Sequence, residues 1–92
     1  MRILSLTIRL HAPWVHSLKE KRMVVKSLTA KLRNKYNVSA AETDEQDIHQ
    51  IIVIGVASIA ANHAQADSME EILHFVESNT EAELVEHVKE VF

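Results

Sequence analysis

The 92-residue chain contains no cysteine. This absence excludes disulfide bonds, thiolate nucleophiles, iron–sulfur clusters and cysteine-ligated zinc, and with them the class of small secreted disulfide scaffolds. Aromatic residues make up only 4% of the chain, so an RNA-recognition motif, which stacks bases on rings of its central strands, is not expected. The single glycine, Gly55, lies inside a predicted strand rather than in a phosphate-binding loop. We expect it to allow close packing at that point.

Long hydrophobic runs are also missing. The longest, Ile51 to Ala57, is far shorter than the roughly 20 residues that a membrane helix needs. The N-terminal stretch alternates polar and apolar residues, unlike a signal peptide. We therefore expect a soluble, cytoplasmic protein. A length of 92 residues with 47% hydrophobic content predicts a single domain, residues 1–92, with one core.

The net charge of −3 hides a strong separation of charge along the chain. Residues 1–38 hold nine basic residues and one acidic residue, whereas residues 39–92 hold twelve acidic residues and one basic residue. Such a separation is typical of a face that binds polyanions. It is equally typical of two elements that attract each other within the fold or across a dimer, and composition leaves both interpretations open.

Hydrophobic periodicity divides the chain into six elements. Residues 2–11 alternate as in a strand with one buried face, whereas residues 18–35 repeat apolar side chains at helical spacing. Ser17 and Glu20 form a capping box, which places the start of the helix at Leu18. The last segment also fits helical spacing, and we predict a strand there. The predicted elements are strands at Arg2–His11, Val38–Asp44, Gln50–Ala61 and Ala82–Val91, and helices at Leu18–Lys35 and Ala64–Ser78.

This order of elements predicts a ferredoxin-like βαββαβ sandwich of the α+β class, with two helices on one face of a four-stranded antiparallel sheet. Right-handed crossovers place the first and third strands at its centre. The third strand carries apolar residues at both parities, such as Ile52 and Val53, so both of its faces need cover. Because the helices cover one face only, we expect a homodimer formed through the sheet. The expected inward positions of the second helix are Met69, Ile72, Leu73 and Val76.

No catalytic or metal-binding constellation stands out. The six histidines are spread singly along the sequence. The one pair that could converge on a metal is His11 and His16, which flank the loop at Pro13 and Trp14. We therefore predict no metal, no cofactor, no catalytic residue and no enzymatic activity. A hydrolytic or small-molecule enzyme that uses the acidic turn from Glu42 to His49 is a third hypothesis, for which no convergent acid, base and nucleophile can be named.

The first predicted helix carries the most informative charges. A helical projection places four of its cations in one line beside the buried stripe, and a line of this kind can neutralise nucleic-acid phosphates. Lys21 instead points to the buried edge, from which it can reach a neighbouring loop. Cations in a first turn oppose the helix dipole, so another cause must favour them. The predicted nucleic-acid-binding residues are Lys19, Lys21, Arg22, Lys26 and Arg33.

The stretch HSLKEKRMVVKSLTAKLRNKYNVSAAETDEQD, residues 16–47, resembles the YlxP-like family of small bacterial proteins of unknown function. The resemblance implies a ferredoxin-like fold and no established catalytic activity. Genes of this family often lie among those for translation initiation and ribosome maturation, which favours RNA or a ribosomal component as partner. Members commonly have Trp where this chain has His49. The positions that match the most regularly occurring residues of the family are Ser17, Leu18, Lys19, Lys21, Arg22, Glu42, Asp47 and Gln50.

Two functions are therefore weighed. The first is a non-enzymatic RNA- or ribosome-associated module that uses the basic helix, with Trp14 as the one candidate for base stacking. The second is a protein-interaction or regulatory dimer module without nucleic-acid binding, which recognises its partner through the sheet or the Trp14 loop. In the second case the cations are solvated or neutralised by the acidic half of the chain, and Trp14 closes one end of the core.

Overall fold

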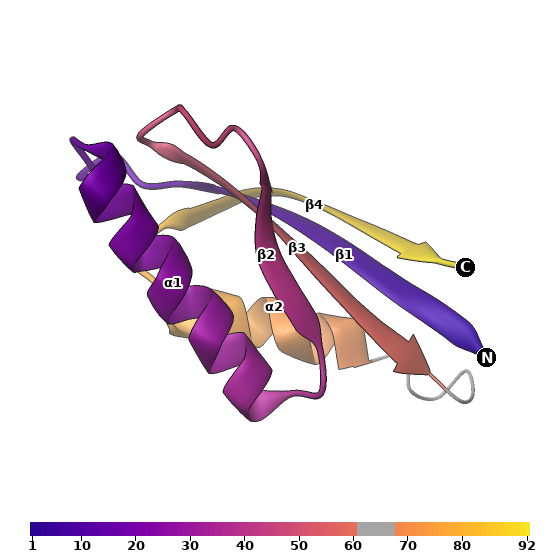
Figure 1. Cartoon of the computed structure of the whole chain (residues 1–92). Helices are drawn as coiled ribbons and strands as arrows, with labels where there is room; N and C mark the ends of the chain where they lie inside the picture. The colour runs from indigo at the N-terminus through magenta and orange to yellow at the C-terminus, as the bar shows by residue number, and fades with distance from the viewer. Residues whose placement is uncertain (61–67) are drawn as a thin grey trace.

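The computed structural model describes residues 1–60 and 68–92. A four-stranded sheet forms one layer and two helices form the other (Figure 1). Because residues 61–67 are outside the described part, the predicted helix start at Ala64 and the predicted strand end at Ala61 lie outside it too. The elements are β1 (Arg2–His11), α1 (Leu18–Lys35), β2 (Ser39–Asp44), β3 (Ile51–Ala60), α2 (Ser68–Ser78) and β4 (Glu83–Val91).

The sheet has the strand order β2-β3-β1-β4, and every neighbouring pair is antiparallel. This topology confirms the ferredoxin-like fold and the central position of β1 and β3. It also confirms the last segment as a strand, because β4 pairs with β1 from Leu4↔Val91 to His11↔Glu83. The pairing, with one irregularity after Arg9, overrides the local helical spacing, since strand formation depends on the neighbour more than on the segment itself.

The capping box sets the start of α1. The Ser17 Oγ accepts a hydrogen bond from the Glu20 backbone N–H at 3.1 Å, so one otherwise unpaired amide of the first turn is satisfied. Leu28 and Leu32 face the sheet and are buried, while Val24 and Val25 pack at the margin. The helix therefore lies along the sheet on the apolar stripe that its sequence predicts.

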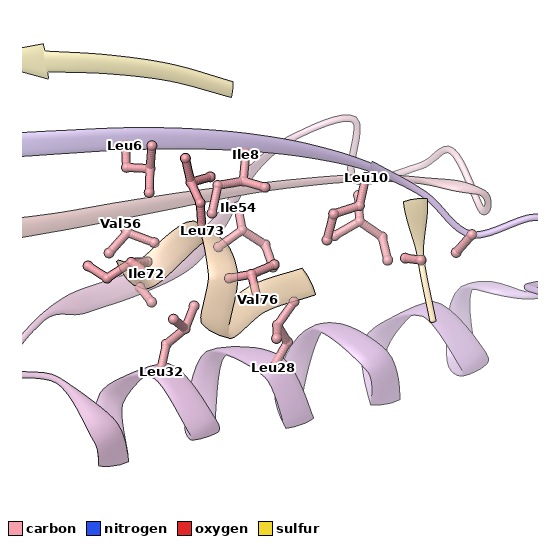
Figure 2. Close-up of a cluster of buried hydrophobic side chains, with 14 of the residues drawn as sticks. Leu6, Ile8, Leu10, Leu28, Leu32, Ile54, Val56, Ile72, Leu73 and Val76 are labelled. Atoms are coloured by element: carbon pink, nitrogen blue, oxygen red, sulfur yellow. The ribbon is translucent and has the colours of Figure 1, made fainter. Parts of the chain in front are cut away.

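The core fills the space between the helices and one face of the sheet (Figure 2). From the sheet come every second residue of β1 and the matching residues of β3, as the alternation predicts. All four inward positions predicted for α2 are buried. The labelled core side chains are Leu6, Ile8, Leu10, Leu28, Leu32, Ile54, Val56, Ile72, Leu73 and Val76.

Both helices of residues 1–60 and 68–92 lie on the same face of the sheet, so within this part of the chain the second face carries no helix (Figure 1). Its centre is built from small side chains, because β1 places Ser5 and Thr7 there opposite Ala57 and Gly55 of β3. A Cβ on Gly55 would lie 2.6 Å from the Thr43 Cγ2, so the glycine allows the close packing that its position predicts.

One end of this free face is apolar. Ile3 is the register partner of Ile59 on β3 and exchanges two backbone hydrogen bonds with Phe92, which follows β4. These three side chains therefore lie in one row across three strands, and their exposed fractions are 42%, 70% and 67%. We call Ile59, Ile3 and Phe92 the apolar row.

Candidate nucleic-acid interface

Helix α1 presents a line of exposed cations, Lys19, Arg22, Lys26 and Arg33, which we call the basic stripe. At 3.6 residues per turn these four side chains fall within roughly 60° around the helix axis. None of the ion pairs within residues 1–60 and 68–92 involves them, since those pairs are Arg9–Glu45, Lys21–Glu42 and Lys89–Glu70. The stripe is thus an uncompensated row of positive charge in the described part of the chain.

Arg33 fixes the direction in which the basic stripe faces. Its Nη1 donates a hydrogen bond to the Ala40 carbonyl oxygen at 2.8 Å, and Ala40 belongs to β2, an edge strand of the sheet. The stripe therefore runs along the β2 side of α1. Arg33 also has a structural role at that sheet edge, while its side chain remains exposed.

Lys21, predicted to bind nucleic acid with the four cations of the basic stripe, is buried and does not lie beside them on the surface. Its side chain is 1% exposed, because its position in the helix lies close to that of Leu28 and Leu32. The Nζ donates to the carbonyl oxygens of Glu45 and Ile48 at 2.5 and 2.6 Å. The ammonium group is thus covered by the protein and is not accessible to a phosphate.

The third polar contact of Lys21 is with Glu42, whose Oε2 lies 3.0 Å from the Nζ. The contact is an ion pair without the alignment of a hydrogen bond, and Oε2 has no other polar partner in the described residues. Together the three contacts tie the β2–β3 connection to α1. The helical projection predicted that Lys21 reaches a neighbouring loop, and this loop is the β2–β3 connection. In the sequence, the signal for such a buried contact is a lysine at an inward-facing position of the helix.

The acidic turn from Glu42 to His49 shows no catalytic arrangement. Glu42 is committed to Lys21, and the Asp44 Oδ1 accepts a hydrogen bond from the Glu45 backbone N–H at 2.9 Å. Glu45 adopts a positive φ of 55°, an uncommon conformation for a residue with a side chain. Three carboxylates of this turn thus have structural contacts: Glu42 with Lys21, Asp44 with the backbone of Glu45, and Glu45 with Arg9.

No metal site forms among the described residues, which contain no group of three or more His, Asp or Glu side chains placed to hold an ion. His11 and His16 both lie in the described part, and neither takes part in such a group. His63 lies outside it. The structure therefore offers nothing that would turn the His11–His16 pair into a ligand set.

Trp14 lies on the opposite flank of α1 from the basic stripe. Its ring, 39% exposed, lines a shallow groove of about 330 Å³ between α1 and the α2–β4 connection. The α1 residues of the groove point roughly 140° around the helix axis from the mean direction of the stripe. Trp14 is thus neither fully buried nor beside the cations. The other lining residues are Met23, Val24, Ser27, Leu28, Asn79, Thr80 and Glu81.

The acidic part of the chain has ion pairs of its own. Lys89, the one basic residue beyond position 38, pairs with Glu70 of α2. This hydrogen bond and the charge of Lys89 hold the pKa of Glu70 below its ordinary value. Where α1 meets α2, the contact is instead aromatic: the Tyr36 and Phe75 rings meet edge to face with centroids 5.5 Å apart. The described structure thus pairs none of the stripe cations with the carboxylates of α2 or β4.

Comparison with known proteins identifies the chain. A family model described as "Protein of unknown function (DUF503)" matches residues 3–88. The chain belongs to this family. A relative within the curated proteins is the "Uncharacterized protein YlxP" of Bacillus subtilis (strain 168), which is 37% identical over 68 residues, or 73% of this chain and 74% of the relative. Both matches confirm the YlxP-like resemblance, and neither description assigns a function to the family.

Several positions that the resemblance marks as regular have structural roles. Ser17 caps α1, and Lys21 and Glu42 form the buried ion pair. The Gln50 Nε2 donates to the Pro13 carbonyl oxygen at 3.0 Å and so holds the loop before α1 to the start of β3.

None of the helices in the described part of the chain is long and apolar enough to cross a membrane.

Proposed function

We propose that this protein is a non-enzymatic module that binds RNA, ribosomal RNA included, through the basic stripe of α1. The observation that supports the proposal is the exposure of Lys19, Arg22 and Lys26 without a carboxylate partner in the described residues. Two of these cations occupy the first turns of the helix, where the dipole disfavours them. A polyanionic partner would offset this cost.

The chemistry of the stripe favours phosphate groups over bases. Ammonium and guanidinium groups in a row displace condensed counterions from a nucleic-acid backbone, a contribution that does not depend on sequence. Within residues 1–60 and 68–92, the Trp, Tyr and Phe rings lie away from this flank of α1. We therefore expect binding that is strong at low salt and weakly dependent on sequence.

The salt dependence of RNA binding tests the proposal. With three to four phosphate contacts, the affinity should fall about 40- to 150-fold between 50 and 200 mM salt. The measurement is a series of fluorescence anisotropy titrations with a labelled structured RNA. Absence of binding at 50 mM salt, or an affinity that salt does not change, would contradict the proposal.

A pair of double variants locates the interface. Lys19→Ala with Lys26→Ala should weaken binding and reduce the salt slope by about 2, because two phosphate contacts are removed. Lys31→Ala with Lys35→Ala is the matched control, since it removes the same charge from exposed positions on the other flank of the same helix. Arg33 is left unchanged because it also supports β2. Equal losses in the two variants would show that net charge alone, and not the stripe, determines the affinity.

A specific observation favours a second candidate function, self-association. The apolar row is exposed on a sheet face that has no helix, and we propose that a second copy of the chain covers it. An isologous dimer needs one self-complementary patch, and a second copy carries the same row by definition. The two proposals are compatible, because the basic stripe and the free face lie on opposite sides of the sheet.

A further inference from the structure

The positions of the aromatic rings restrict the kind of RNA that the basic stripe can bind. Proteins that hold single-stranded RNA stack its bases on exposed rings along the path of the backbone. The chain has four Trp, Tyr and Phe residues, and all four are described. Trp14 lines the groove on the opposite flank of α1, and Tyr36 packs against Phe75. The fourth, Phe92, belongs to the apolar row on the far side of the sheet.

The sheet offers no stacking platform either. The free face has Ser5 and Thr7 at the centre of β1, and Gly55 lies beside Thr7 on β3. Small aliphatic and hydroxyl side chains cannot stack on an unpaired base as aromatic rings do. A single strand that followed the basic stripe would thus gain contacts to its phosphates alone, while its flexible bases stayed unbound.

The helix that carries the basic stripe sets the spacing of its cations. Lys19 and Arg33 are 14 residues apart, or about 21 Å along the axis at 1.5 Å per residue, and the hydrogen bond from Arg33 to β2 fixes the far end. A row of cations spaced regularly along one helix best fits phosphates that are themselves held in a regular array. A base-paired RNA helix provides that array and is recognised by shape and backbone, without exposed bases.

We infer that the ligand of the basic stripe is double-stranded RNA, such as the stem of a hairpin, and not single-stranded RNA. The inference rests on the proposed function and specifies its ligand. It assigns recognition to the backbone of a preformed helix, with α1 lying along phosphates and Trp14 taking no part.

The test compares two RNAs of equal length and label, a hairpin stem and an unpaired pyrimidine strand, at one salt concentration. The stem should bind roughly tenfold more tightly, because its phosphates are denser and fixed. Trp14 is the sole tryptophan, so its fluorescence reports stacking directly. It should stay unquenched when the stem binds, and Trp14→Ala should leave the affinity for the stem unchanged.

The outcomes separate this inference from the proposed function. Equal or tighter binding of the single strand, or quenching of Trp14 on binding, would overturn the duplex inference while RNA binding itself stands. Failure of both RNAs to bind at low salt would overturn the proposed function and the inference together. Tighter binding of the stem that disappears in the Lys19→Ala, Lys26→Ala variant, but not in the Lys31→Ala, Lys35→Ala variant, would support both.

Discussion

At the scale of single residues, Lys21 shows how one charged side chain can serve the fold. A buried ammonium group is costly unless it is paired, and here it donates to two carbonyl oxygens and forms an ion pair with one carboxylate. The residue lies within a basic segment, yet it is the one cation of α1 that is buried. Its role is to hold the β2–β3 connection against the start of the helix.

Removal of this contact should destabilise the protein strongly. Lys21→Met leaves the Glu42 carboxylate and two carbonyl oxygens without their partner, so we expect a loss of about 3–5 kcal/mol in the free energy of unfolding. Lys21→Met combined with Glu42→Leu should lose less than Lys21→Met alone, because no unpaired buried charge remains. Urea denaturation measures both. A loss of only a few tenths of a kcal/mol in Lys21→Met would show that the ion pair is exchanged for water at no cost.

At the scale of elements, α1 has three distinct flanks. One faces the core, one carries the basic stripe along β2, and one lines the Trp14 groove. At the C-terminal end of α1, Tyr36 contacts α2 by packing edge to face against Phe75. Burial there, together with the charge of Glu71 and a hydrogen bond to it, raises the pKa of the Tyr36 phenol.

This shift predicts how the α1–α2 contact responds to alkaline pH. Because the pKa is raised in the folded state, the neutral phenol stabilises the fold fully below its ordinary pKa of about 10, and this stabilisation is lost as the pH rises through the folded value. Glu71→Gln should lower the pKa of Tyr36 toward its ordinary value by removing the nearby charge. Tyr36 is the sole tyrosine, so tyrosinate absorbance follows it directly. Glu77→Gln is the matched control on the same helix, and an equal shift in both variants would contradict the assignment to Glu71.

At the scale of the whole molecule, the two layers carry different surfaces. The basic stripe lies on the helical side, beside the β2 edge. The described carboxylates of the second half lie on β2 and the turn after it, on α2, on β4 and in the connection between α2 and β4. The opposite side of the sheet ends in the apolar row. The surface that we propose for RNA and the surface that we propose for a second copy therefore lie on different sides of the molecule.

Oligomeric state is the property that tests the second surface. If a second copy covers the apolar row, Ile59→Asp should shift the protein from dimer to monomer, because two introduced charges would face each other across the interface. Met23→Asp is the matched control, since Met23 is a similarly exposed apolar residue, 65% against 70%, on α1 and away from the sheet. Sedimentation equilibrium over a range of concentrations measures the change. A wild-type protein that stays monomeric, or a dimer that Ile59→Asp leaves intact, would rule out this interface.

Local patterns in the sequence were sufficient for the elements and their order. Alternation in β1, helical spacing in α1 and the Ser17–Glu20 cap are properties of neighbouring residues, so they can be read before the chain folds. The order of the elements then restricts the topology to few alternatives. The ferredoxin-like arrangement and the central position of β1 and β3 follow from these two facts alone.

Only the tertiary structure decided which polar groups form hydrogen bonds or ion pairs within the molecule. A projection places Lys21 near the buried edge, but whether its charge finds partners depends on residues 21 to 27 positions away. In the same way, Arg33 is committed to β2 and Trp14 is separated from the basic stripe through contacts between distant elements. The amino-acid sequence therefore determined that α1 is basic, whereas long-range packing determined that Lys21 is buried while Lys19, Arg22 and Lys26 stay exposed.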